Sequence, residues 1–419
     1  MSKVLLVGGG GREHAMALAL TSKAGDVELF ATPGNPGIKE VATCVALAPE
    51  AIVDFAKHEN IAWAVVGPEA PLVDGLADAL EAAGIPTCGP SKAAAQLEGS
   101  KAFMRRIADE AGAPSPRFAV ITNADELNAA LADWPGLPVV KADGLAAGKG
   151  VFLPDTLDGC RDAALALLGG SLGDAGKTVV LEERLEGVEA SLFYACAGSE
   201  SVALPHARDH KRRLDDDQGP NTGGMGAISP NPLLNDALIS EIENTMIRPT
   251  LRTMEKRGAS FKGFLFAGVM LTQEGPKLLE YNVRLGDPEA QVILPRIKPG
   301  AFAELCQAVA KDALAGHHVD VDPRPTCAVV IAAGGYPEAP RKGDVINVAD
   351  DCQNHERWVV HAGTREEDGR LLTHGGRVLA VVARGESPVS ARQSAFLGVD
   401  KIHFENMHYR KDIGSDKTV

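Results

Sequence analysis

Short apolar runs alternate with helical patterns of apolar and polar residues along the first part of the chain. The expected strands are residues 3–7, 27–31, 61–66 and 86–88, and the expected helices are residues 12–21, 49–59 and 71–83. Such alternation is typical of a parallel sheet that is covered by helices on both faces. Each expected strand ends in a loop that contains glycine, at the edge of the sheet where ligands bind.

Two further regions and a small terminal unit follow. A compact α/β unit has strands at 117–121, 138–141, 151–153 and 178–182 and helices at 124–132 and 157–168. The next region mixes strands at 261–272 and 277–283 with helices at 236–256 and 301–314. A proline-rich linker is expected at 321–326, and strands at 327–333 and 377–384 predict a small C-terminal domain. The pattern indicates a multidomain protein of the α/β and α+β classes.

The composition is that of an ordinary folded protein, and a chain of 419 residues is too long for one core. The formal net charge of −14, without a basic run, argues against nucleic acid as a partner. No apolar run is long enough to span a membrane, and the amino terminus enters a strand pattern directly, so neither a membrane nor a signal peptide is expected. Seven scattered cysteines predict reduced thiols and a cytoplasmic location.

Four consecutive glycines, Gly8 to Gly11, connect the first expected strand to the first expected helix. Backbone N–H groups at such a turn, together with the helix start, can form an anion site. A dinucleotide-binding fingerprint is disfavoured because Glu13 occupies the position of its third glycine, and residues 31–35 offer no carboxylate for a ribose hydroxyl. A single phosphate beside Arg12 fits better, and a tight turn without a ligand is the alternative.

A second glycine-rich loop occupies residues 144–150, between the strand that carries Lys141 and the strand that begins at Val151. It is not a P-loop, because Gly150 replaces the Ser or Thr that would bind magnesium and no helix follows. The small residues and the lone Lys149 predict a hairpin flap over phosphates. A plain hairpin turn is the alternative.

A charged segment follows the apolar run at 277–279. If it is a strand, alternation places Glu280, Asn282 and Arg284 on one face. Two oxygen ligands two residues apart suit Mg²⁺, which takes further oxygens from water and from ATP phosphates. Arg284 would then contact a transferring phosphoryl group or a carboxylate. A solvated charged edge is the alternative, and the turn expected at 285–289 argues against it.

Three polar segments are ambiguous from their residue types alone. The carboxylates of Glu182, Glu183 and Glu189 would most often be surface charges. His210, within residues 209–212, is more often a satisfied hydrogen-bonding group than a catalyst. Residues 220–226 are rich in Asn, Thr and Gly, which indicates a binding loop.

Taken in order, these segments resemble the phosphoribosylamine–glycine ligases (glycinamide ribonucleotide synthetases) of the ATP-grasp superfamily. The matching motifs are GGGGREH at 8–14, VGPEAPL at 66–72, LEGSKAF at 97–103, VKADGLAAGKGV at 140–151, DHKR at 209–212, GPNTGGMGA at 219–227, EYNVRLGDPE at 280–289 and AAGGYP at 332–337. The resemblance extends to residues 410–414 and is specific because the motifs are several, long and collinear. The 144–150 loop alone would indicate only the ATP-grasp superfamily.

The resemblance implies a ligation in de novo purine biosynthesis. ATP phosphorylates the carboxylate of glycine, and the amine of 5-phosphoribosylamine attacks the resulting acyl phosphate, which gives glycinamide ribonucleotide, ADP and phosphate. Activation is needed because a carboxylate is a poor electrophile. Closure of the flap would exclude water and protect the acyl phosphate from hydrolysis.

The resemblance also assigns residues to roles. The ATP site is expected at Lys101, Lys141, Gly144, Gly148, Lys149, Gly150, Glu182, Glu183, Leu185 and Glu189, with the adenine at 182–185 and the ribose at Glu189. Mg²⁺ or Mn²⁺ is expected at Glu280 and Asn282, and the expected catalytic residues are Arg284, Asp209 and Lys149. The substrates glycine and 5-phosphoribosylamine are expected at Gly10, Gly11, Arg12, Glu69, Asp209, Asn221, Thr222, Gly223 and Arg284. Among these, the resemblance implies that Arg284 stabilises the transferred phosphoryl group and that Asp209 binds the glycine ammonium.

The resemblance implies an ATP-grasp fold with an N-terminal Rossmann-like parallel-sheet domain and a small C-terminal domain. The expected boundaries are 1–102 for the N-terminal domain, 103–122 with 188–322 for the central domain, 123–187 for the lid subdomain and 323–419 for the C-terminal domain. A monomer is expected, without nucleic acid or membrane partners.

The chain departs from the family pattern at a few positions, which include Gly9, Tyr281 and Leu285, and none of these removes an assigned charge. Another ATP-grasp ligase or a biotin-dependent carboxylase subunit is the nearest alternative, and the motifs at 8–14 and 220–227 argue against both. A non-catalytic nucleotide-binding relative is disfavoured because the charged site residues are retained. A nicotinamide dehydrogenase is disfavoured by the failed dinucleotide fingerprint.

Overall fold

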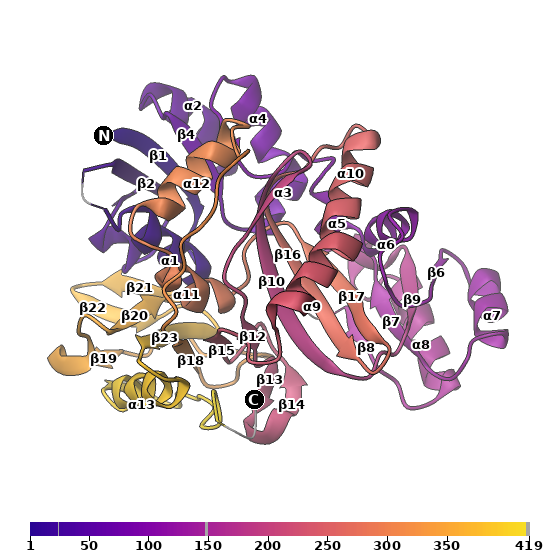
Figure 1. The fold of residues 1–419 in the computed structure, drawn as a ribbon. Coiled ribbons are helices and arrows are strands. Elements are labelled where there is room, and N and C mark those ends of the chain that lie inside the picture. Colours follow the sequence, from indigo (N-terminus) through magenta and orange to yellow (C-terminus); the bar gives the residue numbers. More distant parts are fainter. Residues whose placement is uncertain (24, 147–149, 416–419) are drawn as a thin grey trace.

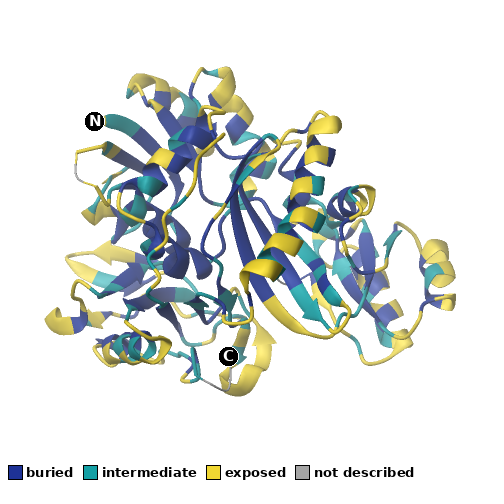
Figure 2. Cartoon of the chain, in the orientation of Figure 1, coloured by how far each residue is buried: buried dark blue, intermediate teal, exposed yellow. Residues whose placement is uncertain are grey.

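The structure is a computed structural model that describes residues 1–23, 25–146 and 150–415. Within these residues, strands form four sheets of four or five strands and three two-stranded ribbons (Figure 1). The sheets are deeply buried, whereas the outer faces of the surrounding helices are exposed (Figure 2). No helix in the described part of the chain is long and apolar enough to cross a membrane.

The N-terminal domain is built on the predicted parallel sheet, with strand order β3-β2-β1-β4-β5. Its strands are β1 (Ser2–Gly8), β2 (Val27–Pro33), β3 (Thr43–Cys44), β4 (Trp63–Val66) and β5 (Thr87–Cys88). Its helices are α1 (Gly11–Leu20), α2 (Ile52–His58), α3 (Glu69–Asp74) and α4 (Leu76–Ala82). Val4, Leu5 and Leu6 in β1 are fully buried although they alternate in direction, which shows that both faces of the sheet are covered.

Two predicted helices are interrupted. The helix expected at 71–83 is divided into α3 and α4 because Gly75 adopts a left-handed backbone with φ 99°. The helix expected at 236–256 consists of α9 (Asp236–Ile242), a π-helical turn η5 (Glu243–Ile247) and α10 (Arg248–Lys256). Pro249, which lacks an N–H group, is the second residue of α10 and lies two positions after the end of this wider turn, as expected where a helix must accommodate proline.

A small α/β unit extends from the rest of the molecule (Figure 1). Its sheet has the order β6-β9-β7-β8, with β6 (Phe118–Ile121), β7 (Pro138–Ala142), β8 (Val151–Phe152) and β9 (Val179–Glu183). Helices α7 (Ala124–Ala132) and α8 (Leu157–Leu168) pack on it and share a separate core with its strands. Lys141 in β7 pairs antiparallel with Val151 in β8, so the glycine-rich segment between them connects a hairpin as predicted.

The central sheet has the order β11-β10-β16-β17. Its strands are β10 (Val188–Ala197), β11 (Glu200–Ala203), β16 (Lys262–Thr272) and β17 (Gly275–Asn282). Helices α6 (Lys101–Glu110), α9 and α10 cover one face, and α12 (Ala301–Ala310), which ends before the predicted position 314, covers the other. Stacking of Phe302 on Phe264 joins α12 to β16.

The C-terminal sheet includes two strands from the central part of the sequence. Its order is β12-β15-β18-β23-β20, with β12 (Arg208–Asp209), β15 (Gly226–Ser229), β18 (Thr326–Ala332), β20 (Arg357–His361) and β23 (Arg377–Arg384). Helix α13 (Pro388–Val399) packs against it. Because β12 and β15 belong to this sheet, the segment between them is held by the C-terminal domain.

Candidate active site

The charged residues at the end of β17 lie on the face that the strand pattern predicts. Glu280 is opposite Gly268 of β16, where a Cβ atom would lie 3.2 Å from Glu280 Cγ, so the glycine leaves room for the carboxylate. One Arg284 NH2 group donates a hydrogen bond of 2.9 Å to Asn282 Oδ1. Asn282 is buried, and its Nδ2 has no hydrogen-bond partner in the described chain. The unused Nδ2 of this buried amide could donate to an acceptor on a bound ligand, such as a phosphate oxygen.

Three lysines surround Glu280. Burial would raise the pKa of the Glu280 carboxyl, but the charges of Lys211, Lys141 and Lys101 hold it below its ordinary value. Burial lowers the pKa of Lys101, which begins α6 and donates a hydrogen bond of 3.3 Å to the carbonyl of Gly144. Cations gathered around a carboxylate in a half-buried site suit a bound polyphosphate and its metal ion.

The donor set fits a divalent cation that is shared with a nucleotide. Glu280 and Asn282 supply oxygen atoms, which are the ligands that Mg²⁺ and Mn²⁺ prefer. In residues 1–23, 25–146 and 150–415, no group of three or more His, Cys, Asp and Glu side chains is arranged to hold a metal ion. A cation at Glu280 and Asn282 would therefore take its other oxygens from phosphates and water.

Glu182 is the centre of a buried ion network. Its carboxylate accepts hydrogen bonds from Arg105 Nε at 2.8 Å, Arg105 NH2 at 2.7 Å and Lys141 Nζ at 2.6 Å. Burial opposes ionisation, yet Lys141 and Arg105 outweigh it and lower the pKa of Glu182 to about 2. Arg105 also donates to the carbonyls of Leu278 and Leu279. The network holds Lys141 and strand β9 against β17.

The other residues expected at ATP lie in β9, in the turn that follows it, in β10 and in the glycine-rich loop. Glu189 in β10 is exposed and pairs with Lys211 Nζ at 2.5 Å. Glu183 Oε2 accepts from the backbone N–H of Arg117 at 3.2 Å, and Leu185 is partly exposed. Gly144 and Gly150 are the ends of the glycine-rich loop, whereas the expected site residues Gly148 and Lys149 lie outside the described residues.

A chain of ion pairs connects the N-terminal loop to the end of β17. Glu69, in the first turn of α3, lies 3.9 Å from Arg12 NH2 and 3.3 Å from Arg284 Nε. Arg284 also pairs with Glu98 at 2.8 Å, and Arg12 NH1 donates to the carbonyl of Leu285 at 3.1 Å. The residues expected for phosphoribosylamine therefore lie next to the residue expected for phosphoryl transfer.

Close packing accounts for much of the glycine run. Gly8 has φ 129°, and a Cβ atom on Gly9 would lie 2.5 Å from the carbonyl oxygen of Gly34. The backbone N–H of Gly10 donates to Glu13 Oε2 at 2.7 Å, and Arg12 Nε donates to Glu13 Oε1 at 2.6 Å. Glu13 thus occupies one N–H group of the expected anion site, so a phosphate there would be bound chiefly by Arg12 and the remaining N–H groups.

Asp209 lies in β12 near the carboxylate of Glu289, which was not among the expected site residues. Asp209 Oδ1 is inaccessible to water and has no hydrogen-bond partner among the described residues. Burial and the nearby carboxylate of Glu289 raise the pKa of Asp209, and burial also raises the pKa of Glu289. Ser191 Oγ donates to Glu289 Oε1 at 3.3 Å. Two crowded carboxyl groups suit an ammonium ligand, which would relieve their repulsion.

The loop after β14 (Gln218–Asn221) is closed by the C-terminal domain. Thr222 donates to the carbonyl of Lys211 from its N–H and its Oγ1, each at 2.8 Å, while Asn221 is exposed. The N–H of Gly223 donates to Tyr336 Oη at 3.0 Å, and Arg377 NH1 donates to the carbonyl of Gly223.

Arg377 brings this loop to the end of β17. It also donates to the carbonyl of Asp287 at 2.6 Å and pairs with the Asp287 carboxylate at 3.2 Å. Asp287, Glu289 and Tyr336 lie within the motifs that carried the family resemblance, so they could have been found from the sequence. Arg377 has no such local signal, because only the fold brings it to the site.

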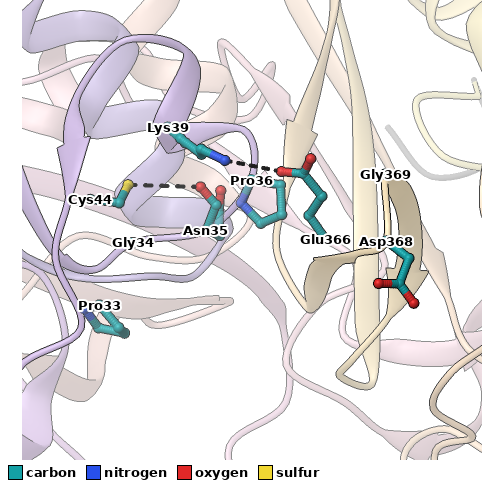
Figure 3. A pocket seen from close by; sticks show the side chains of 9 residues that line it. All are labelled: Pro33, Gly34, Asn35, Pro36, Lys39, Cys44, Glu366, Asp368 and Gly369. Carbon is teal, nitrogen blue, oxygen red and sulfur yellow. Dashed lines mark hydrogen bonds and ion pairs between the residues drawn. The ribbon is translucent and has the colours of Figure 1, made fainter.

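A cavity of about 360 Å³ lies elsewhere, between the loop after β2 and the ribbon of β21 (Thr364–Glu367) and β22 (Arg370–Thr373) (Figure 3). Lys39 Nζ pairs with Glu366 at 3.2 Å across it. Its described lining residues include none of those expected to bind ATP, metal or substrate. The chemistry of the site therefore depends on the charged cluster at β17 rather than on this cavity.

The lid on a β-hairpin, the cationic cluster at its base and the paired oxygen donors on β17 define an ATP-grasp enzyme. The Hydrogenobacter thermophilus 2-oxoglutarate carboxylase biotin carboxylase domain, whose structure contains MgADP and bicarbonate, is 14% identical and has a TM-score of 0.76 over 97% of this chain and 91% of that chain. At this identity the similarity concerns the fold alone.

The chain belongs to the phosphoribosylglycinamide synthetase family. The models of its N domain, its ATP-grasp (A) domain and its C domain match residues 2–98, 99–290 and 326–416. Phosphoribosylamine–glycine ligases of Ralstonia nicotianae and Rhizobium meliloti are each 44% identical, over 98% of this chain and 98% of theirs. The crystal structure of phosphoribosylamine–glycine ligase from Thermotoga maritima is 36% identical, with a TM-score of 0.88 over 98% of this chain and 100% of that chain. The chain is an ATP-grasp ligase.

Proposed function

We propose that the chain joins glycine to 5-phosphoribosylamine with cleavage of ATP to ADP and phosphate, the ligation of de novo purine biosynthesis. The observation that carries the proposal is the ion-pair chain from Arg12 through Glu69 to Arg284. This ion-pair chain supports the proposal because it joins the N-terminal loop, which we expect to receive 5-phosphoribosylamine, to the strand end at which we propose that the phosphoryl group is transferred.

In the first step an oxygen of the glycine carboxylate attacks the γ-phosphorus of ATP, and the bond from that phosphorus to ADP breaks. Lys101 and Lys141 hold the phosphates in this proposal, and Arg284 stabilises the charge that develops on the transferred group. Glu280 and Asn282 would hold a divalent cation, Mg²⁺ or Mn²⁺, which would neutralise charge on the phosphates. The Asp209 carboxylate, with Glu289 beside it, binds the glycine ammonium and so orients the carboxylate.

In the second step the amine nitrogen of 5-phosphoribosylamine attacks the carbonyl carbon of glycyl phosphate, loses a proton and expels phosphate. Gly10, Gly11 and Arg12 hold the phosphoribosyl group, with Glu69 as its neighbour. The glycine-rich segment between β7 and β8, which we propose to include Gly148 and Lys149 among its ATP contacts, excludes water from the acyl phosphate. Glu182, Glu183, Leu185 and Glu189 line the adenosine side of the site.

The proposal also includes the domain boundaries expected from the sequence, a monomeric state and a cytoplasmic location. The cysteines of the described chain are free, as expected for a reducing compartment.

ADP release by the purified protein tests the proposed function. It should require ATP, a divalent cation, glycine and freshly generated 5-phosphoribosylamine together, and the product should be glycinamide ribonucleotide. Equal release of ADP when bicarbonate or another amino acid replaces glycine would contradict the proposal.

A further inference from the structure

The segment between β12 and β15 contains a hairpin with little burial of its own. The hairpin consists of β13 (Arg212–Leu214) and β14, and all four residues of β14 are exposed (Figure 2). It is attached at its base to the site, because Lys211 precedes it and Thr222 follows it. A two-stranded hairpin is marginally stable in water without outside support.

The C-terminal tail, residues 408–413, supplies that support, chiefly through Arg410. Arg410 is fully buried and forms a bidentate pair with Asp412, with distances of 2.8 and 2.7 Å. Its NH1 group donates to the carbonyl of Arg212 at 3.0 Å and to Asp217 Oδ1 at 2.7 Å. A single guanidinium group therefore joins the tail to the first residue of β13 and to the turn between β13 and β14.

Further hydrogen bonds from residues 408–412 follow the same hairpin. Asp412 Oδ2 accepts from the N–H of Asp216 at 2.9 Å, and the N–H of Lys411 donates to Asp215 Oδ1 at 2.8 Å. His408 Nε2 lies 2.9 Å from the carbonyl of Arg213. The contacts are distributed along the hairpin rather than confined to one point.

The tail is itself fixed to the C-terminal domain. The backbones of His408 and Ala332 exchange two hydrogen bonds, of 2.8 and 2.9 Å. Arg392 of α13 donates to the carbonyls of Lys411 and Ile413, and Ile413 is buried in the C-terminal core. The tail can therefore act as a rigid support.

The hairpin transmits its position to the substrate loop through Lys211. The carbonyl of Lys211 accepts both hydrogen bonds of Thr222, and Thr222 Oγ1 in turn accepts from the N–H of Gly224. Gly224 is packed against Asp209, since a Cβ atom on it would lie 2.6 Å from Asp209 Oδ1. The side chain of Lys211 pairs separately with Glu189, so Lys211 is also fixed on the side where ATP is expected to bind.

We infer that Arg410 and Asp412 are positioning residues for glycine binding. The C-terminal tail holds the hairpin at 212–221, and the hairpin holds Thr222 to Gly224 against Asp209. The inference rests on the proposed function, in which Asp209 binds the glycine ammonium. Neither residue is among those expected to bind a substrate, so the tail acts on the KM for glycine more than on the chemical step.

The test compares Arg410→Gln with Asp217→Asn in the full chain. Arg410→Gln removes the buried cation, whereas Asp217→Asn weakens only the hairpin side of the contact, at a side chain that is 57% exposed and so tolerant of substitution. We expect the KM for glycine to rise about tenfold in Arg410→Gln and about threefold in Asp217→Asn, with kcat and the KM for ATP changed less than about twofold. Arg410→Lys should give an intermediate KM because it keeps the charge and loses the bidentate pair.

Arg341→Gln is the matched control, since Arg341 also pairs with two carboxylates in the C-terminal domain, at Asp344 and Glu405. It should leave every kinetic constant unchanged. Amide hydrogen exchange within 212–221 should accelerate in Arg410→Gln and Asp217→Asn and stay unchanged in the control. An unchanged KM for glycine in Asp217→Asn despite accelerated exchange would overturn the inference, and so would an equal rise in the KM for ATP.

Failure of the proposed function gives a different result. In that case the wild-type protein would show no glycine-dependent ADP release, whereas the exchange experiment would still report whether the tail holds the hairpin. If Arg410→Gln fails to fold, Asp217→Asn decides the inference by itself.

Discussion

At the scale of single residues, Glu280 is the side chain on which the metal assignment depends. Glu280→Gln keeps the shape of the side chain and removes the charge that Lys101, Lys141 and Lys211 face. We expect kcat/KM for ATP to fall more than about 100-fold, because loss of a residue that merely supports a metal ligand already costs 10- to 100-fold. ADP release measured over a Mg²⁺ titration checks this, and activity that stays normal at low Mg²⁺ would remove Glu280 from the metal site.

Glu182 makes a residue-scale prediction about pH. Its pKa in the folded protein, about 2, is lower than the ordinary value of 4.5. Its contribution to stability is therefore complete above pH 4.5 and is lost as the pH falls toward 2. Glu182→Gln leaves Arg105 and Lys141 without their counter-charge and should cost about 3 kcal/mol at neutral pH.

Urea unfolding followed between pH 3 and 7 measures the difference between wild type and Glu182→Gln. The difference should be largest at neutral pH and should shrink below about pH 4.5. Glu274→Gln is the control, because Glu274 is an exposed partner of Lys277, and it should cause no measurable change. A difference that does not depend on pH would show that packing rather than charge makes Glu182 important.

At the scale of elements, the turn from β1 to α1 is constrained by steric fit. Gly8 has φ 129°, and a Cβ atom there would lie 2.7 Å from Glu13 Cδ. Gly8→Ala should displace Glu13 and with it the N–H of Gly10, so we expect the KM for 5-phosphoribosylamine to rise about tenfold and stability to fall by about 1–3 kcal/mol. Steady-state kinetics and thermal unfolding measure the two effects.

Gly84→Ala is the matched control for this turn. Gly84 also has a positive φ, of 80°, but open space surrounds the position of its Cβ atom. Gly84→Ala should therefore cost only the backbone strain, about 1 kcal/mol, and leave the KM for 5-phosphoribosylamine unchanged. Equal kinetic effects of the two substitutions would mean that the collision with Glu13 is unimportant.

The elements that could be predicted from the sequence are those with a local signal. The N-terminal sheet follows from alternation of strands and helices, the lid hairpin follows from glycine between two apolar runs, and β17 follows from alternation at Glu280 and Asn282. The helix expected at 71–83 is divided at Gly75. Its left-handed backbone could not be predicted, because helical periodicity carries no information about the sign of φ.

Pairing between distant segments could not be predicted in this way. Strand β10, which pairs with β16 over ten positions, was not expected, and neither was the entry of β12 and β15 into the C-terminal sheet. Arg377 begins β23, and it reaches Asp287 only because β23 lies in the same sheet as β12 and β15. Such contacts depend on the register and order of strands from separate parts of the chain, and hydrophobic periodicity carries no information about either.

At the scale of the whole molecule, the N- and C-terminal domains meet at the backbone of His361. His14 Nδ1 accepts a hydrogen bond of 2.8 Å from the N–H of His361, and Asn35 Nδ2 donates to its carbonyl at 2.9 Å. Asn35 Nδ2 also lies 3.0 Å from the carbonyl of Gly9, so the same contact supports the glycine loop. Burial, with a smaller effect from the neighbouring His361, lowers the pKa of His14 to about 3.

This contact between domains should weaken in mild acid. The pKa of His14 in the folded protein is lower than the ordinary 6.5, so the unfolded chain binds the proton first and stability is lost as the pH falls below 6.5. At pH 5 the loss from His14 should be about 2 kcal/mol relative to pH 7.5.

His14→Asn keeps an acceptor near the position of Nδ1 but cannot titrate. It should therefore be less stable than wild type at pH 7.5 and should lose about 2 kcal/mol less than wild type on acidification to pH 5. Urea unfolding at the two pH values measures both changes, with exposed His58→Asn as the control that should follow wild type. If His14→Asn lost as much stability as wild type, the acid sensitivity would have to come from the other buried histidines, and the contact at His361 would not act as the link that acid weakens.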